Sequence, residues 1–212
     1  MKKYKLLVTG CGRSGTSYIC SVLGNLNPVV DIGHESWLGR DGIASFLLAF
    51  DIPAPRGPEI TYKSFNAVLH QVRHPLGTIS SYHTAGQESW EFVKKCLPQV
   101  AKHSWTYQRK KKVPEAQQKE ILLASVKNWY FWNLQAEKIS SWTYKVEDLP
   151  EVFEEFCSRA SIKCDMDVFS KNLKKDSRKT RQDYVKISWE EIKRADVKLY
   201  DDVRHLAEKY GY

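Results

Sequence analysis

The sequence has no long run of apolar residues. Its most apolar segments, Leu6–Val8 and Ile43–Phe50, fall far short of the roughly 20 residues that span a bilayer. The basic start, Met1–Lys5, is followed by too little apolar sequence for a signal peptide. We therefore expect a soluble, cytoplasmic protein with no membrane partner.

Glycine and proline are also scarce, at 11 and 8 of the 212 residues. A low-complexity or fibrous chain would contain far more of both. Hydrophobic residues make up 42% of the sequence and aromatic residues 12%, which is enough apolar surface to bury a core. A chain of this length suits one sizeable domain, so we expect a single domain over residues 1–212.

Paired metal ligands are missing as well. The cysteines are odd in number, show no CxxC spacing and have no paired histidines nearby. A chain of this size needs no disulfides to fold, so we expect reduced thiols and no bound metal. The five cysteines are Cys11, Cys20, Cys96, Cys157 and Cys164.

Acidic residues are outnumbered by basic ones. There are 25 Asp and Glu against 33 Lys and Arg, and the formal net charge is +8. Such a balance indicates an anionic partner, which the charge alone leaves open between nucleic acid, an anionic membrane and a phosphorylated small molecule. The basic residues are concentrated in Arg109–Lys112 and Lys171–Arg181.

What the sequence does contain is an alternation of strand-like and helix-like segments. We therefore expect an α/β fold in three layers, with a central, mainly parallel sheet flanked by helices. Ligands bind such sheets at the carboxyl ends of the strands. Strands are expected at 4–9, 28–31, 66–72 and 141–146, and helices from 14 onward, at 43–50 and 75–81, after 114, at 150–160 and from about 196.

A glycine-rich segment, Thr9–Ser17, joins the first expected strand to its helix. Backbone N–H groups and the positive end of a helix attract anions at such a place, so this glycine loop predicts a phosphate site. The pattern GxxxxGK[ST] of nucleotide hydrolases is matched at Gly10 and Gly15, but Thr16 stands where that pattern has Lys. A magnesium-dependent kinase or NTPase is therefore only an alternative.

Two motifs resemble those of a known family. Arg13–Tyr18 resembles the 5′-phosphosulfate loop of sulfotransferases that use 3′-phosphoadenosine 5′-phosphosulfate. Some 60 residues later, Arg73 and Ser81 have the spacing of that family's 3′-phosphate motif. The resemblance implies a P-loop-like sulfotransferase fold, this donor, adenosine 3′,5′-bisphosphate as the product, and no metal.

The resemblance also implies roles for individual residues. Arg13 would stabilise the charge that develops on the leaving 5′-phosphate, and Arg73 and Ser81 would hold the 3′-phosphate. The basic residues Arg178 and Lys179 could close over the donor as the family's late basic loop does, although an exposed charged loop explains them equally well. The remaining donor contacts would come from Gly12, Ser14, Gly15, Thr16 and Ser17.

An acceptor hydroxyl must lose its proton, so a general base is needed near the sulfur. Glu35 lies 22 residues after Arg13, a placement similar to that of the basic glutamate in carbohydrate sulfotransferases. We expect Glu35 to be the base, with His34 as the second candidate. Alternatively, one of the pair caps or orients a helix that begins near Asp41, and the other is solvated.

The sequence thus favours an enzyme that transfers a sulfuryl group to a hydroxyl or an amine of a small molecule or glycan. No nucleic-acid partner is expected. Two other classes stay open at this point, namely a P-loop nucleotide-binding enzyme and a basic nucleic-acid-binding module.

Overall fold

In the computed structural model, the described residues are 3–26, 30–35, 37–51, 60–82, 87–103, 115–173 and 185–212. They divide into two compact units. The first unit contains Met1–Arg73 and Gln135–Thr180, and the second contains His74–Leu134 and Arg181–Tyr212. Each unit is described separately below.

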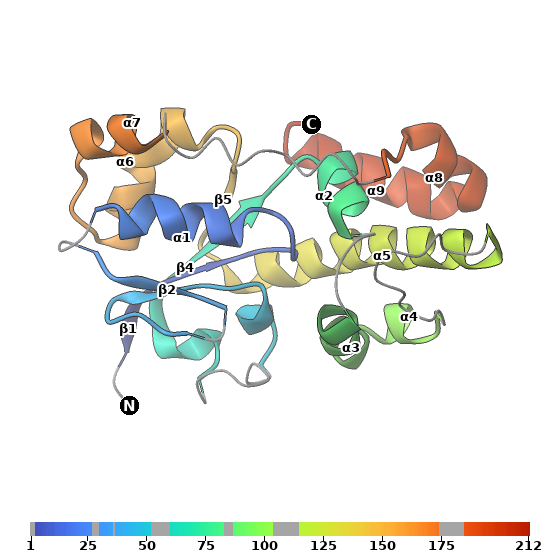
Figure 1. Ribbon diagram of the computed structural model, residues 1–212, viewed down its shortest axis with the longest axis horizontal. Helices are drawn as coiled ribbons and strands as arrows, with labels where there is room; N and C mark the ends of the chain where they lie inside the picture. The colour runs from blue at the N-terminus through green and yellow to red at the C-terminus, as the bar shows by residue number, and fades with distance from the viewer. Residues whose placement is uncertain are drawn as a thin grey trace. The chain divides into compact units, whose positions relative to one another are not determined.

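The first unit is built on a five-stranded sheet with the strand order β2-β3-β1-β4-β5 (Figure 1). Every pair of neighbouring strands is parallel, which confirms the expected α/β class with a central parallel sheet flanked by helices. The strands are β1 (Tyr4–Thr9), β2 (Ile32–His34), β3 (Gly42–Ala44), β4 (Phe65–Val72) and β5 (Trp142–Lys145).

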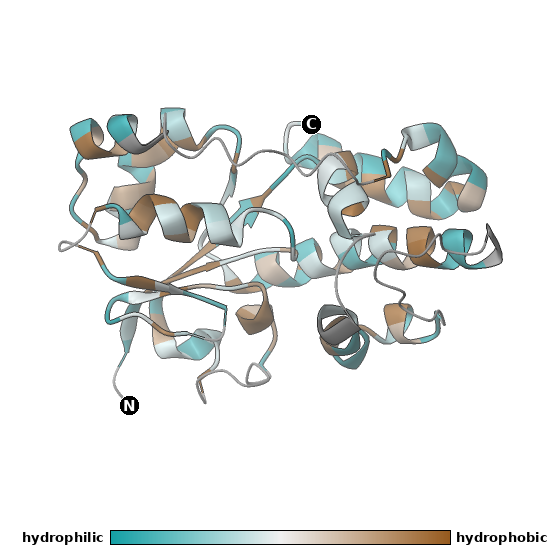
Figure 2. Ribbon diagram, viewed as in Figure 1, coloured by the Kyte–Doolittle hydropathy of each residue, from teal (hydrophilic) through white to brown (hydrophobic). Residues whose placement is uncertain are grey.

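One face of this sheet is covered by the helices α1 (Thr16–Gly24), α6 (Leu149–Ala160) and α7 (Met166–Leu173) (Figure 1). Apolar residues from β1, α1 and α6 form one buried core there, and the hydrophobic residues of α1 show as brown segments of that helix in Figure 2. The rings of Phe153 and Phe169 stack within it at 3.7 Å between centroids. Helix α1 begins at Thr16, directly after the turn that follows the carboxyl end of β1.

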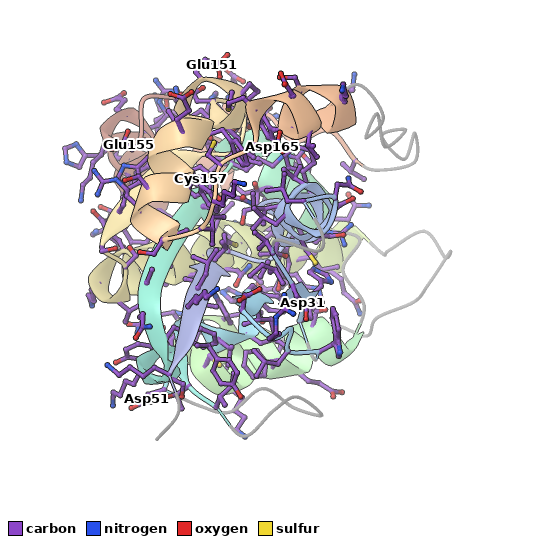
Figure 3. The ribbon with its side chains drawn as sticks, turned by 90° about the vertical axis from the view of Figure 1, so that its left-hand side faces the viewer. Asp31, Asp51, Glu151, Glu155, Cys157 and Asp165 are labelled. Atoms are coloured by element: carbon purple, nitrogen blue, oxygen red, sulfur yellow. The ribbon has the colours of Figure 1, made fainter. Side chains whose placement is uncertain are left out.

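Helix α6 is amphipathic in the usual way, with its apolar stripe towards the core. Figure 3 shows Glu151 and Glu155 on this helix, and both are exposed, whereas Cys157 is buried. The helix has Pro150 in its first turn and ends at Ala160, followed by the C-cap residue Ser161 with a positive φ of 52°.

The second unit is helical. Its core is aromatic: Tyr82 lies 4.7 Å from Trp90, and Trp129 lies 6.3 Å from Tyr210, between ring centroids. Its helices are α2 (Pro75–Tyr82), α3 (Gln87–Cys96), α4 (Pro98–Ala101), α5 (Glu115–Ile139, whose last five residues belong to the first unit), α8 (Trp189–Ala195) and α9 (Val197–Lys209). None of the helices in the described ranges is long and apolar enough to cross a membrane.

Two sequence predictions of local structure were wrong. Residues 43–50 form no helix, because Gly42–Ala44 is a strand and Leu47–Ala49 is one 3₁₀ turn. A strand buried on both faces is a short apolar run, which periodicity cannot distinguish from a buried helix. The strand expected at 28–31 lies instead at Ile32–His34, and residues 27–29 are outside the described ranges.

Candidate functional site

Four strands of the first unit end next to polar side chains. Strand β1 leads into the glycine loop, β2 into Glu35, β3 into Ser45 and β4 into Arg73. Because neighbouring strands are parallel, their carboxyl ends meet at one edge of the sheet, which is where α/β proteins bind ligands. The structure therefore brings the predicted loop, the predicted base and one predicted phosphate ligand to the same edge.

The glycine loop turns sharply before α1 begins. Arg13 has a φ of 69° and is exposed, and Gly15 has a φ of 103° at the N-cap of the helix. No side chain caps this helix, so its first N–H groups have no side-chain acceptor at the cap. Such N–H groups and the helix dipole together favour an anion at this position.

A buried hydrogen-bond chain holds the back of the glycine loop. Gln71, on β4, donates from Nε2 to the Ser14 carbonyl at 2.8 Å. Tyr144, on β5, donates from its hydroxyl to Gln71 Oε1 at 2.7 Å. Burial raises the pKa of Tyr144 well above its usual value, so the phenol keeps the proton that it donates.

The same strand explains the glycines of the loop. A Cβ on Gly10 would lie 2.2 Å from the Gln71 carbonyl oxygen, and a Cβ on Gly15 would lie 2.9 Å from Gln71 Nε2. Sequence reasoning missed both Gln71 and Tyr144. A glutamine inside the apolar strand 66–72 was the available signal, because a buried amide needs hydrogen-bond partners.

The front of the loop contacts the predicted base. Thr16, the first residue of α1, donates from Oγ1 to Glu35 Oε1 at 3.0 Å. Ser45 donates to the other carboxyl oxygen, Oε2, at 2.9 Å. His34 Nε2 lies 3.4 Å from both Thr16 Oγ1 and Glu35 Oε1. Two residues predicted for different tasks, Thr16 and Glu35, are therefore directly hydrogen-bonded.

The environment of Glu35 raises its pKa to about 7. Burial is the main cause, since it disfavours the charged carboxylate, and only 21% of the side chain is exposed. The hydroxyls of Ser45 and Thr16, and the backbone of Phe46 and Leu47, oppose this shift. A carboxyl group with this pKa can accept a proton near neutral pH.

Glu35 also accepts hydrogen bonds from the backbone N–H groups of Phe46 and Leu47, where the 3₁₀ turn Leu47–Ala49 begins, so it also orients that turn. Within residues 37–51 no helix begins at Asp41, because Gly42–Ala44 is a strand. The Asp41 carboxyl group instead ties two chain segments together. Its Oδ2 accepts from the Asp31 N–H at 2.9 Å and its Oδ1 pairs with Lys5 at 2.8 Å. Ser45 follows the end of β3 and orients Glu35 through its hydroxyl, although no sequence motif singled it out.

Of the other residues predicted for the site, only some lie in the described part of the first unit. Arg73 is half-buried and donates from a guanidinium nitrogen to the Arg13 carbonyl at 3.3 Å, so it reaches the glycine loop. Gly12 is buried and Ser17 is half-buried. Ser81 lies on α2 in the second unit. The basic block 109–112 and the pair Arg178 and Lys179 lie outside the described residues.

Among the residues that the structure describes, no group of three His, Cys, Asp or Glu side chains is placed to hold a metal ion. The five cysteines all lie in the described residues and form no disulfide there, and Cys11 and Cys157 are buried.

No family model and no curated protein matches the sequence. Among solved structures, the chain is similar to the mouse sulfotransferase SULT7A1 complexed with PAP, at 14% identity and a TM-score of 0.41. The match covers 91% of this chain and 66% of that chain. A similarity this distant carries no functional argument, so the proposed function rests on the site itself.

Proposed function

We propose that the protein is a sulfotransferase that moves a sulfuryl group from 3′-phosphoadenosine 5′-phosphosulfate to a hydroxyl group of a small molecule or glycan. The observation that carries this proposal is the hydrogen bond between Thr16 and Glu35. It joins an anion-binding loop to a carboxyl group with a pKa of about 7, which are the two parts that such a transfer needs.

In the proposed reaction, the acceptor oxygen attacks sulfur while the bond between sulfur and the 5′-phosphate oxygen breaks. The acceptor proton passes to Glu35. Arg13, which is exposed on the loop, stabilises the charge that appears on the leaving phosphate. A sulfuryl group has less charge on its oxygens than a phosphoryl group, so arginine and N–H donors suffice without a metal.

Glu35 is a better candidate for the base than His34. Both of its carboxyl oxygens are held by hydroxyl donors, which fixes their direction, and burial has already moved its pKa close to neutral. His34 is more exposed and lies 3.4 Å from its two neighbours, a distance at which a hydrogen bond is weak. We assign His34 an auxiliary role beside the carboxylate.

Arg73 is proposed to bind the 3′-phosphate, together with Ser81. The contact between the Arg73 guanidinium and the Arg13 carbonyl supports a position beside the loop for Arg73, while the role of Ser81 rests on the spacing of the motif. Gly12, Ser14, Gly15 and Ser17 are proposed to complete the donor contacts, and Arg178 and Lys179 to approach the donor from the basic segment.

Isothermal titration calorimetry with four ligands tests this proposal. Adenosine 3′,5′-bisphosphate should bind, and AMP, which lacks the 3′-phosphate, should bind at least tenfold more weakly. Preference for ATP with magnesium would indicate a nucleotide hydrolase or kinase, and salt-sensitive binding of an oligonucleotide alone would indicate a nucleic-acid-binding module. Either result would overturn the proposed function.

A pair of arginine variants tests the site. Arg13→Ala should weaken bisphosphate binding and lower sulfuryl transfer, because it removes the exposed cation of the loop. Arg159→Ala is the matched control, since Arg159 lies on α6 and pairs with Glu155 at 2.7 Å. Equal losses in the two variants would mean that only the overall charge matters.

A further inference from the structure

The hydroxyl of Thr16 has only one proton to donate. In the structure that proton is donated to Glu35 Oε1 at 3.0 Å. Thr16 is also the first residue of α1, directly after Gly15, where the loop is proposed to bind the anionic donor. A phosphosulfate oxygen cannot donate a hydrogen bond at neutral pH, so it can engage the hydroxyl only by taking the proton that Glu35 now accepts.

We propose that Thr16 couples the two substrates: when the phosphosulfate binds, it takes the hydrogen bond of Thr16 away from Glu35, which makes the carboxylate a stronger base. This inference rests on the proposed function and concerns the regulation of the same site. The base then holds a proton most strongly only when the group to be transferred is in place.

The other groups around Glu35 make this exchange specific to Thr16. Ser45 bonds the opposite oxygen, Oε2, and comes from the end of β3 rather than from the loop. The Ser45 oxygen itself accepts from the Leu47 N–H at 3.1 Å, which fixes its proton towards Glu35. His34 is a titratable side chain beside the carboxyl group, with Nε2 3.4 Å from Oε1.

When the Thr16 hydroxyl directs its hydrogen towards the bound anion, its interaction with the Glu35 carboxylate changes from attractive to repulsive. Oxygen Oε1 would then face a lone pair of the Thr16 hydroxyl instead of its hydrogen. A protonated Glu35 can donate to that lone pair, whereas the carboxylate is repelled by it. The negative charge of the bound anion also repels the carboxylate. Binding therefore raises the pKa of Glu35 in two ways, through loss of the Thr16 hydrogen bond and through charge repulsion, and only the first requires Thr16.

Carbon-13 NMR titration of labelled glutamate carboxyl groups tests the inference. The Glu35 signal is assigned by its absence from Glu35→Gln, and its pKa is measured with and without saturating adenosine 3′,5′-bisphosphate. In the wild type the ligand should raise this pKa by more than about one unit, since a hydrogen bond to a charged group is worth about that much.

Three variants separate the two routes. In Thr16→Val the ligand-induced rise should be smaller by about one unit, because only the repulsion remains. In Ser45→Ala, which also removes one hydroxyl donor from Glu35, the pKa of the free protein should increase but the ligand-induced rise should stay as in the wild type. Thr16→Ser should restore the wild-type rise.

Equal ligand-induced rises in Thr16→Val and Ser45→Ala would overturn the coupling. So would an unchanged Glu35 pKa in the ligand-free Thr16→Val protein, a measurement that needs no ligand. Weakened binding by a variant is overcome by titrating it to saturation. Failure of the wild type to bind the bisphosphate at all would instead refute the proposed function, so the two failures are distinguishable.

Discussion

The two sides of the glycine loop are held in different ways. Behind it, Gln71 and Tyr144 form a buried chain of neutral hydrogen bonds of 2.7 and 2.8 Å that ends on the Ser14 carbonyl. In front of it, Thr16 bonds a partly exposed carboxyl group with a pKa of about 7. Neither Gln71 nor Tyr144 titrates near neutral pH, whereas Glu35 does.

This difference indicates a division of labour. Neutral buried bonds keep the same geometry over a wide pH range and are costly to break, so they suit a scaffold. A carboxyl group that titrates near pH 7 can gain and lose a proton during turnover, so it suits chemistry. Changes behind the loop should therefore alter stability, and changes in front of it should alter rate and pH dependence.

The largest effect is expected from Glu35→Gln. Loss of a general base should lower kcat by about 10²- to 10⁴-fold, because the amide cannot accept the acceptor's proton. Bisphosphate binding should not be weakened, since the loop is unchanged and the amide removes a negative charge beside the bound anion. Turnover of a radiolabelled donor, screened against phenols, sugars and glycans, measures the rate. A wild-type rate in this variant would remove Glu35 from the mechanism.

The same substitution should change how stability depends on pH. Glu35 titrates at about 7 in the folded protein and near its ordinary value of 4.5 when unfolded, so the folded state binds more protons between these pH values. Stability of the wild type should therefore fall relative to Glu35→Gln as pH rises from 4.5 to 7, by up to about 3 kcal/mol. Urea denaturation at pH 4.5, 6 and 8 measures this, and parallel pH curves would contradict it.

A glycine substitution tests the back of the loop. Gly10→Ala should lower the free energy of unfolding by about 1–3 kcal/mol or more, because its Cβ would lie 2.2 Å from the Gln71 carbonyl oxygen. Gly24→Ala is the matched control: nothing lies within 4 Å of its Cβ, and alanine favours the helix. Denaturant unfolding of both proteins should show opposite signs.

Tyr144→Phe should cost about 1–2 kcal/mol of stability, because it leaves Gln71 Oε1 buried without this donor. Since Tyr144 has no titrating role, the loss should be the same at pH 6 and pH 8, and the pH profile of kcat should keep its wild-type midpoint. A shifted midpoint would show that the two sides of the loop are not independent.

The smallest effect is expected from Arg13→Gly. With a φ of 69°, Arg13 occupies a backbone region that costs a residue with a side chain about 1 kcal/mol, and glycine removes that cost. The variant should therefore gain about 1 kcal/mol of stability while losing bisphosphate affinity. Thermal unfolding and calorimetry together check both signs.

The sequence predicted the segments that are strongly periodic or punctuated by glycine and proline. Strand β1, the loop before α1, and α2 beginning at Pro75 all lie where they were expected. These features are local, since they depend on residues a few positions apart. The motifs that resemble those of sulfotransferases likewise pointed to Arg13, Glu35 and Arg73.

The contacts that organise the site were beyond sequence reasoning. Gln71 and Ser14 are 57 positions apart and are brought together by the pairing of β4 with β1, whereas Tyr144 and Gln71 are 73 apart and are brought together by the pairing of β4 with β5. Ser45 looked like one polar residue inside an apolar helix, because the buried strand β3 has no alternation to reveal it. Thr16 was assigned to the donor alone, and its bond to Glu35 requires the order of β2, β3 and β1.

Of the residues that the structure describes, three other than glycine have a positive φ, and two of them are Arg13 and Glu35. At both positions glycine or asparagine would suit the backbone better. A lineage that kept the fold but lost the chemistry should therefore drift towards those residues at positions 13 and 35. If distant relatives retain Arg and Glu at these two positions, natural selection for catalysis has kept them there, because the backbone alone would favour other residues.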